Sequence, residues 1–190
     1  MKKIIFILTF FLIAFLSFKI FSNKNFFIKT IINFVILKKD NYILIIIMTF
    51  SIDRISKVKI INHQINNDII YINDFINFEL VWNTGIAFGF LSSNSNFIYN
   101  SITIIIAFVI IFLVYLVKKS GISDKILFST IIGGALGNLY DRYTYSAVPD
   151  FIDIHYKSFH WFTFNMADIF ITIGIIILII KDLYFKNEKY

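Results

Sequence analysis

The sequence predicts an α-helical membrane protein: a four-transmembrane-helix bundle with a small β-rich segment on its extracytoplasmic surface. Two observations support this fold class. Hydrophobic residues make up 58% of the 190-residue chain and charged residues only 16%, against about 45–50% and about 25% in soluble domains, and the mean hydropathy is +0.77. The apolar residues also gather in long runs, as membrane-spanning helices require. A chain of this length has room for one compact bundle.

Residues 1–40 form an N-terminal hydrophobic extension that the sequence leaves unassigned. Two lysines followed by the apolar run 4–18 look like the start of a signal peptide, but no convincing small-residue cleavage site follows. The extension is an uncleaved extra span, an amphipathic surface segment, or a stretch upstream of a later start such as Met48. A start at Met48 would delete much of the first span, which argues against it. We expect a membrane domain over 41–182 and a cytoplasmic tail over 183–190.

Four segments are predicted to span the membrane. The first starts near Asn41 and carries charges in its second half, and the others cover 97–117, 126–140 and 162–180. The run 126–140 is shorter than the roughly 17 residues that a span requires, so its ends must reach into flanking residues. It contains three small residues that favour close packing of helices, namely Gly133, Gly134 and Gly137.

Lysines predict the orientation of these spans. They lie before the first span, between the second and third spans, and after the fourth span. These lysines are Lys38, Lys39, Lys118, Lys119, Lys125, Lys181, Lys186 and Lys189. Positively charged flanks stay in the cytoplasm, so both ends of the domain are expected inside. The loops that contain Asn83 and Asp150 then face the extracytoplasmic side together.

The segment 68–91 differs from the spans in character. It mixes β-branched and aromatic residues with turn formers, and its apolar and polar residues partly alternate. This pattern favours short strands at the membrane surface over another helix. Trp82 and Trp161 fit an aromatic belt at the membrane interface.

Two aspartates are the first candidates for chemistry. Asp150 closes the polar loop 141–150, and Asp168 lies near the start of an apolar run. An ionisable group at the edge of a span is costly and therefore points to function. Two carboxyl groups that share one proton can activate a water molecule for hydrolysis. Asp153 is a rival to Asp150, because it would share its face if that stretch were helical.

The other charged residues allow structural interpretations. Asp53 and Lys57 are four residues apart and could pair on one helix face, or they could mark an ordinary helix end among the lipid headgroups. Asn138 and Arg142 are expected to brace the fold, and Asp141 to pair with its neighbour Arg142.

Composition excludes several classes of function. The chain has no cysteine, which removes disulfides, thiolate catalysis and cysteine-based zinc sites. Its net charge of +6 comes from residues beside the apolar runs and forms no patch, so we expect no nucleic-acid partner. His155 and His160 are five residues apart and are interpreted as surface histidines, and His63 is isolated. No metal and no cofactor are expected.

Four short motifs occur in order along the four spans. They are Asp53-Arg54-Ile55-Ser56-Lys57, Asn83-Thr84-Gly85-Ile86-Ala87-Phe88-Gly89, the stretch from Gly133 through Asn138, Asp141 and Arg142 to Asp153, and Phe164-Asn165-Met166-Ala167-Asp168. Together they resemble the lipoprotein signal peptidase (signal peptidase II) family of bacteria, over residues 42–182. Two positions depart from the family pattern: Pro149 replaces a small aliphatic residue, and Ile169 replaces a frequent Ser or Thr.

The resemblance implies an aspartic endopeptidase that cuts prolipoproteins before a diacylglyceryl-modified cysteine and that globomycin inhibits. Its catalytic pair would be Asp150 and Asp168. The residues that would bind substrate or support the site are Asn83, Asn138, Arg142, Asn165, Asp53 and Lys57. The implied partners are modified prolipoproteins and membrane lipid, with the chain a monomer in the bacterial cytoplasmic (inner) membrane and its active site on the extracytoplasmic side.

The alternative is a non-enzymatic membrane protein. A channel, a transporter subunit or an assembly factor could use Asp150, Asp168 and Arg142 as a buried polar network, and a proton relay uses similar residues. A proton relay would need acidic residues at successive depths across the membrane, whereas here the acidic residues are expected at one face of the membrane. Intramembrane proteases with a Gly-x-Gly-Asp signature are disfavoured, because the chain has no such sequence.

Overall fold

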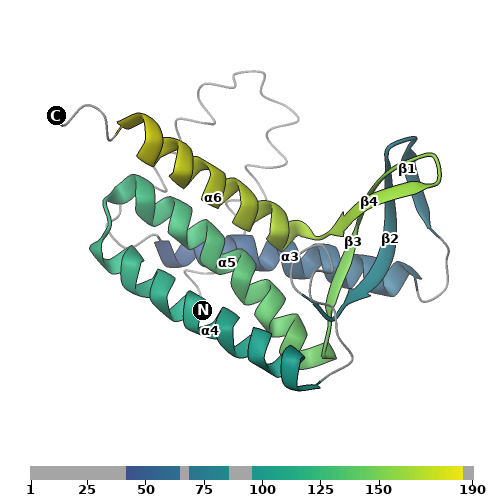
Figure 1. Ribbon diagram of the computed structural model, residues 1–190, viewed down its shortest axis with the longest axis horizontal. Coiled ribbons are helices and arrows are strands. Elements are labelled where there is room, and N and C mark those ends of the chain that lie inside the picture. The colour runs from purple at the N-terminus through teal and green to yellow at the C-terminus, as the bar shows by residue number, and fades with distance from the viewer. Residues whose placement is uncertain (1–41, 65–68, 86–95, 186–190) are drawn as a thin grey trace, which may run out of the picture. The chain divides into compact units, whose positions relative to one another are not determined.

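The structure is a computed structural model, and it describes residues 42–64, 69–85 and 96–185. These residues form long helices and an antiparallel sheet (Figure 1). The helices are α3 (Tyr42–Gln64), α4 (Asn96–Lys119), α5 (Ile122–Tyr145) and α6 (Met166–Phe185), and the strands are β1 (Ile70–Asn73), β2 (Ile76–Asn83), β3 (Val148–Tyr156) and β4 (Phe159–Phe164). The extension 1–40 and four of the orienting lysines, Lys38, Lys39, Lys186 and Lys189, lie outside the described residues.

Helix α5 is the centre of the helical part, because it packs against α3, α4 and α6. Its glycines permit the close approach. A Cβ atom on Gly133 would lie 1.7 Å from Thr49 Oγ1 of α3, and one on Gly134 would lie 2.7 Å from the carbonyl oxygen of Ala167 in α6. The predicted small-residue packing surface is confirmed. Beside it, Ile110 and Val117 of α4 join Ile132 and Ala135 of α5 in a buried apolar cluster.

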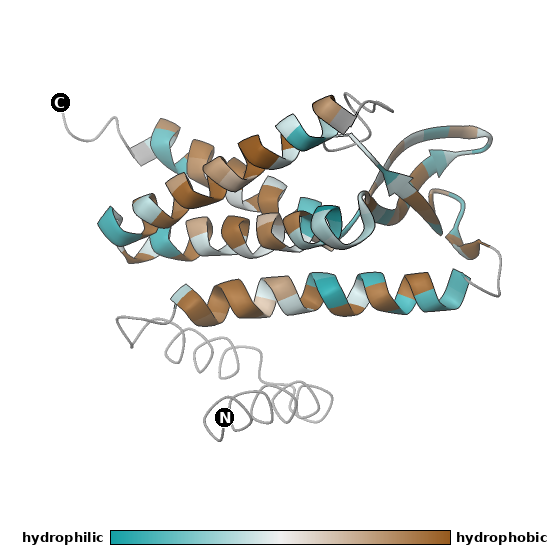
Figure 2. Ribbon diagram, turned by 90° about the horizontal axis from the view of Figure 1, so that it is seen from below, coloured by the Kyte–Doolittle hydropathy of each residue, from teal (hydrophilic) through white to brown (hydrophobic). Residues whose placement is uncertain are grey.

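The helices carry apolar side chains outward and polar side chains inward. Figure 2 shows hydrophobic residues over the length of the helices, and Ile105 and Phe108 of α4 are 61% and 67% exposed, whereas Asp53 and Lys57 of α3 are fully buried. A water-soluble protein has the opposite distribution, whereas lipid favours apolar surface. Among the described helices, one segment, Phe97–Lys119, meets the length and composition of a membrane span on its own.

The helix boundaries confirm one expectation and correct another. Helix α5 covers Ile122–Tyr145 and so extends into the residues that flank the run 126–140 at both ends, as the shortness of that run led us to expect. It ends where Ser146 adopts a left-handed conformation (φ 56°) and donates its N–H to the carbonyl of Arg142. Helix α6 begins at Met166 instead of residue 162, because the apolar residues before it belong to strand β4. The predicted helices near residues 41 and 97–117 agree with α3 and α4.

The sheet has the strand order β1-β2-β3-β4, with every pair antiparallel. The strands predicted within 68–91 are confirmed as β1 and β2. Strands β3 and β4 were not predicted, and the expected polar loop 141–150 is wrong: residues 141–145 are helical and Asp150 lies in β3. Since α3 leads into β1, α5 into β3, and β4 into α6, the sheet lies at one end of these three helices (Figure 1).

Candidate active site

The site lies where strand β3 and the first turn of α6 meet. Asp150 of β3 and Asp168 of α6 are both buried, with exposed fractions of 2% and 8%. Asn165 joins them: its side-chain Nδ2 donates to Asp150 Oδ1 at 2.6 Å, and its backbone N–H donates to Asp168 Oδ2 at 3.3 Å. The two aspartates that the sequence singled out are therefore linked through one asparagine.

Asn165 and Asp168 also form the N-terminal cap of α6. The N–H of Asp168 donates to Asn165 Oδ1 at 3.1 Å, while the Asp168 carboxylate accepts the N–H of Asn165. This reciprocal pattern is a capping box, in which residues three apart satisfy each other's free N–H groups. The start of α6 thus fixes the position of the Asp168 carboxyl group, and the positive end of the helix dipole favours its ionised form.

Two further asparagines donate to the pair, one to each carboxyl group. Asn83, at the end of β2, donates from Nδ2 to Asp150 Oδ2 at 2.9 Å, and its own Oδ1 accepts the N–H of Gly85 at 2.8 Å. Asn138 of α5 donates to Asp168 Oδ1 at 2.9 Å. The pair is therefore held by side chains from β2, α5 and the junction between β4 and α6.

Arg142 braces the site without touching either carboxyl group. Its guanidinium donates to the carbonyl of Gly85, next to Asn83, and lies 5.4 Å above the ring of Tyr99 in α4. The hydroxyl of Tyr99 donates to the backbone carbonyl of Arg142 at 2.9 Å. Arg142 thus connects α4 and α5 to the loop after β2.

A buried ion-pair network lies behind the pair. Lys57 Nζ donates to Asp53 at 2.8 Å, to Asp141 at 2.7 Å and to the side-chain oxygen of Asn138 at 2.8 Å. Lys57 orients the side chain of Asn138, which in turn donates to Asp168. Lys57 therefore affects the position of Asp168 indirectly, through Asn138. Asp53 in turn accepts the backbone N–H of Ala167 at 2.9 Å, so the first described helix holds the start of the last one.

The network differs from the sequence interpretation in the partners of Asp141. That residue was expected to pair with its neighbour Arg142, but it pairs with Lys57 and Arg54 of α3. Arg54 was missed as a site-supporting residue. Its guanidinium also lies 4.7 Å above the ring of Tyr140. The sequence feature that could have identified Arg54 is its position directly after Asp53, since both residues face the same neighbouring helix.

Burial makes Asp150 unusual among carboxyl groups. Its desolvation, followed by the negative charge of Asp168, raises the pKa of Asp150 to about 7, although the hydrogen bonds from Asn83 and Asn165 and the charge of Lys57 act in the opposite direction. Near neutral pH the Asp150 carboxyl group can therefore hold a proton beside a charged neighbour. This is the electrostatic condition for acid–base chemistry by two carboxyl groups.

The structure also corrects the interpretation of the residues after Asp150. Because this stretch is a strand, Asp153 does not share the face of Asp150, and its carboxylate pairs with His160 at 2.7 Å. His155 is buried (7% exposed) and its ring lies 5.4 Å from that of His160, so it is no surface histidine. Within the described residues, Glu79, Asp153 and His160 are close enough together to hold a metal ion.

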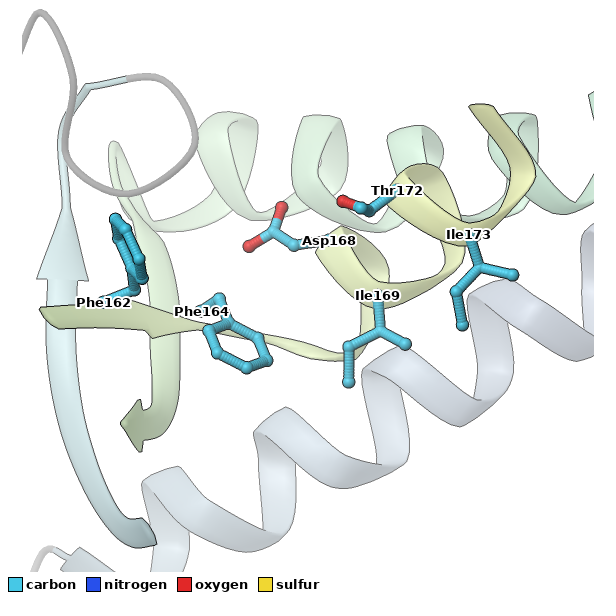
Figure 3. Close-up of a pocket in the computed structure, with 6 residues that line it drawn as sticks. All are labelled: Phe162, Phe164, Asp168, Ile169, Thr172 and Ile173. Atoms are coloured by element: carbon cyan, nitrogen blue, oxygen red, sulfur yellow. The ribbon is translucent and has the colours of Figure 1, made fainter. Parts of the chain in front are cut away.

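A pocket of about 300 Å³ opens beside Asp168. Its other lining residues are mostly apolar: Phe162, Phe164, Ile169, Thr172 and Ile173. Figure 3 shows the phenylalanines on β4 and the remaining residues on α6, with the Asp168 carboxyl group at the pocket. An apolar segment of a ligand can therefore lie next to one of the paired carboxyl groups.

The sequence of this chain is similar to those of known proteins. The family model of signal peptidase (SPase) II matches residues 45–184. A lipoprotein signal peptidase of Pelagibacter ubique (strain HTCC1062) is 48% identical over 147 residues, which cover 76% of this chain and 89% of that relative. One of Francisella tularensis subsp. novicida (strain U112) is 41% identical over 125 residues, or 62% and 76% of the two chains.

Two solved structures have a similar fold. Both are described as a bacterial membrane enzyme determined by the in meso method, at 2.3 Å and 1.9 Å resolution. The first is 33% identical with a TM-score of 0.63 and covers 80% of this chain and 94% of its own. The second is 31% identical with a TM-score of 0.64, and the shares are 77% and 94%.

Proposed function

Because the chain belongs to the signal peptidase II family, we propose that Asp150 and Asp168 are the catalytic pair of an aspartic endopeptidase. As a member of that family the chain is a membrane peptidase that removes signal peptides from prolipoproteins. The observation that carries the proposal is the hydrogen bonding of Asn165 to both carboxyl groups.

The two aspartates take different roles in this proposal. Asp168 is the ionised member, since it lies in the first turn of α6 and accepts N–H groups from Asn138 and Asn165. Asp150 is the protonated member, since its pKa is raised to about 7. A base and an acid are then available side by side at neutral pH.

The reaction follows from these roles. Asp168 takes a proton from a water molecule, whose oxygen attacks the carbonyl carbon of the scissile bond. Asp150 donates a hydrogen bond to the carbonyl oxygen, which becomes negatively charged in the transition state. The C–N bond then breaks, and the proton held by Asp168 passes to the departing amine. In the proposed substrate that amine belongs to the diacylglyceryl-modified cysteine.

The apolar pocket beside Asp168 supports a hydrophobic substrate. A signal peptide consists largely of apolar residues, and the pocket offers phenylalanine and isoleucine side chains next to the proposed base. An apolar side chain near the scissile bond can occupy this pocket while the peptide backbone lies between the two carboxyl groups.

We also propose the four-span arrangement. The four described helices span the bacterial inner membrane with the sheet on the extracytoplasmic side, and the connection at Ser120 and Gly121 between α4 and α5 lies in the cytoplasm. The outward apolar side chains and inward charges of these helices support this arrangement. Both proposed catalytic residues come from one chain, so a monomer suffices for activity.

The test is cleavage of a diacylglyceryl-modified prolipoprotein by the purified protein. Asp150→Asn and Asp168→Asn should each abolish cleavage, since each removes one member of a pair that shares a proton. Asp74→Asn is the matched control, because Asp74 is an exposed carboxylate in the turn between β1 and β2. Globomycin should inhibit the wild-type protein and the control.

Each aspartate is judged separately. A variant that stays folded in detergent and cleaves at a near wild-type rate removes that residue from the pair. If both variants cleave normally, the carboxyl pair is structural. Loss of activity in Asp74→Asn as well would mean that the assay reports the integrity of the sheet.

A further inference from the structure

Strands β2, β3 and β4 bring three potential metal ligands together, on a part of the sheet that the proposed reaction does not use. Glu79, Asp153 and His160 each offer one ligand atom, and these atoms lie within 4.8 Å of one another. The register of the sheet explains why these side chains lie close together. Asp153 of β3 lies opposite Asn77 of β2, and the register of β2 shifts between Phe78 and Val81, at Glu79.

Several buried polar atoms at this place have no partner among the described residues. Asp153 is 2% exposed; its Oδ2 contacts His160 Nδ1 at 2.7 Å, whereas its Oδ1 has no hydrogen bond. Asn77 Oδ1, on the strand position opposite Asp153, is likewise buried without a partner. So are both ring nitrogens of His155, whose ring lies 5.4 Å from that of His160.

Hydrogen bonding within the sheet leaves these groups unsatisfied. The contact with His160 accounts for one oxygen of Asp153 but not for the other, and Glu79 adds a second carboxyl group to the cluster. A buried oxygen without a donor is unfavourable, and such groups in native proteins require an explanation. A cation would supply it, because carboxylates and imidazole are both metal ligands.

We propose that Glu79, Asp153 and His160 bind a divalent transition-metal cation, with Zn²⁺ the best-suited probe. One imidazole and two carboxylates are typical zinc ligands, and a fourth position would remain for water or for the side-chain oxygen of Asn77. Bonds of about 2.0–2.2 Å to the metal place tetrahedral ligands roughly 3.4 Å apart. Binding therefore needs the 2.7 Å contact between Asp153 and His160 to open slightly, and ligand atoms that lie up to 4.8 Å apart to come closer. The half-exposed His160 side chain and the partly exposed Glu79 side chain can provide these movements.

The cation would connect three neighbouring strands through their side chains. Its ligands come from β2, β3 and β4, while Asp150 lies on β3 three residues before Asp153 and bonds to other partners. The site is therefore separate from the proposed catalytic pair. It does not depend on the peptidase function and is tested without an activity assay.

The experiment measures Zn²⁺ binding to the full chain, purified in detergent without a histidine tag and stripped with a chelator. Titration with ZnCl₂ against a chromophoric competitor should give one ion per chain. Glu79→Gln and His160→Ala should each weaken the affinity at least tenfold. His63→Ala is the control, because this histidine lies on α3, and its affinity should equal that of the wild type.

A second measurement keeps the test decisive. Zn²⁺ should raise the unfolding temperature of the wild type and of His63→Ala but not of His160→Ala, since a ligand that binds the folded state stabilises it. The proposal is overturned if the wild type takes up no Zn²⁺ at micromolar concentrations. It is equally overturned if Glu79→Gln and His160→Ala bind as tightly as the wild type. Neither side chain is fully buried, so both variants should fold even if Asp153→Asn does not.

Discussion

Asn83 illustrates how a single side chain sets the acidity of the site. The family resemblance makes Asn83 a candidate for binding substrate or supporting the site. In the structure the amide nitrogen donates to Asp150 and the amide oxygen accepts the N–H of Gly85. Asn83 therefore acts on the proposed chemistry through Asp150, by stabilising its ionised form and lowering its pKa.

This contact predicts a shift in the pH profile. The kcat/KM of the wild type should fall as the pH rises through about 7, where Asp150 loses its proton and both carboxyl groups become charged. Asn83→Ala removes a donor to the charged form, so the pKa of Asp150 rises and the descending limb moves to higher pH. A hydrogen bond to a charged group contributes about 1.5–3 kcal/mol, and about 1.4 kcal/mol corresponds to one pH unit, so the shift should be roughly one to two units.

The maximal rate of Asn83→Ala should also fall, about tenfold to a hundredfold, because the carboxyl group loses one of its fixed contacts. Asp74→Ala, in the same surface segment, should change neither the maximal rate nor the descending limb of the pH profile. If the descending limb of Asn83→Ala stays at the pH of the wild type, Asn83 does not contact Asp150 in solution. Equal losses of rate in both variants would mean that the segment matters only for folding.

The sequence allowed some of these residue contacts to be predicted and concealed others. The four-residue spacing of Asp53 and Lys57 allowed a pairing on one helix face as one of two interpretations, and the structure shows that pairing at 2.8 Å. The three-residue spacing of Asn165 and Asp168 fits a capping box, but this contact was not predicted from the sequence. The contact between Arg54 and Asp141 joins residues 87 positions apart, and no local pattern reports a contact of that kind.

At the scale of elements, the packing of α3 against α5 depends on Gly137. A Cβ atom at this position would lie 2.3 Å from Asp53 Oδ2, the atom that Lys57 contacts. The backbone there is ordinary helix, so the requirement for glycine comes from the close approach of the two helices. Any larger side chain must displace Asp53 and with it the buried ion pair.

We therefore expect Gly137→Ala to destabilise the protein by about 1–3 kcal/mol, the usual effect of overpacking, and to reduce cleavage. Gly121→Ala is the matched control, because a Cβ there meets nothing within 4 Å. Thermal unfolding in detergent measures both. An unfolding temperature for Gly137→Ala equal to that of the control would contradict the packing.

Strands β3 and β4 show the limit of element prediction from this sequence. Apolar residues in β4, such as Phe162 and Phe164, are continuous in sequence with the apolar run of α6. Composition alone therefore predicted one continuous helix where the structure has the end of a strand followed by a helix. Only Asn165, as the helix cap, separates them. The three-residue spacing of Asp150 and Asp153 fits a helix face as well as a strand, and their pairing with β2 was needed to decide.

At the scale of the whole molecule, the proposed orientation can be tested by labelling. The chain has no cysteine, so single substitutions report one position each. Ile122→Cys, at the start of α5, should be protected from an impermeant thiol reagent in intact cells, while Lys157→Cys, between β3 and β4, should react. Both side chains are exposed in the structure. Labelling at position 122 from outside would overturn the proposed topology.

The bond between Asp53 and the N–H of Ala167 has a consequence for the order of synthesis. The residues around the carboxyl pair come from both ends of the domain, so a chain that is still emerging from the ribosome has Asp53, Lys57 and Asn138 but not yet Asp168. Under the proposed mechanism hydrolysis requires Asp168, so activity arises only after α6 has inserted and packed against α3. A nascent or truncated chain that lacks α6 should therefore be inert, and the membrane should be exposed to this protease only in its finished form.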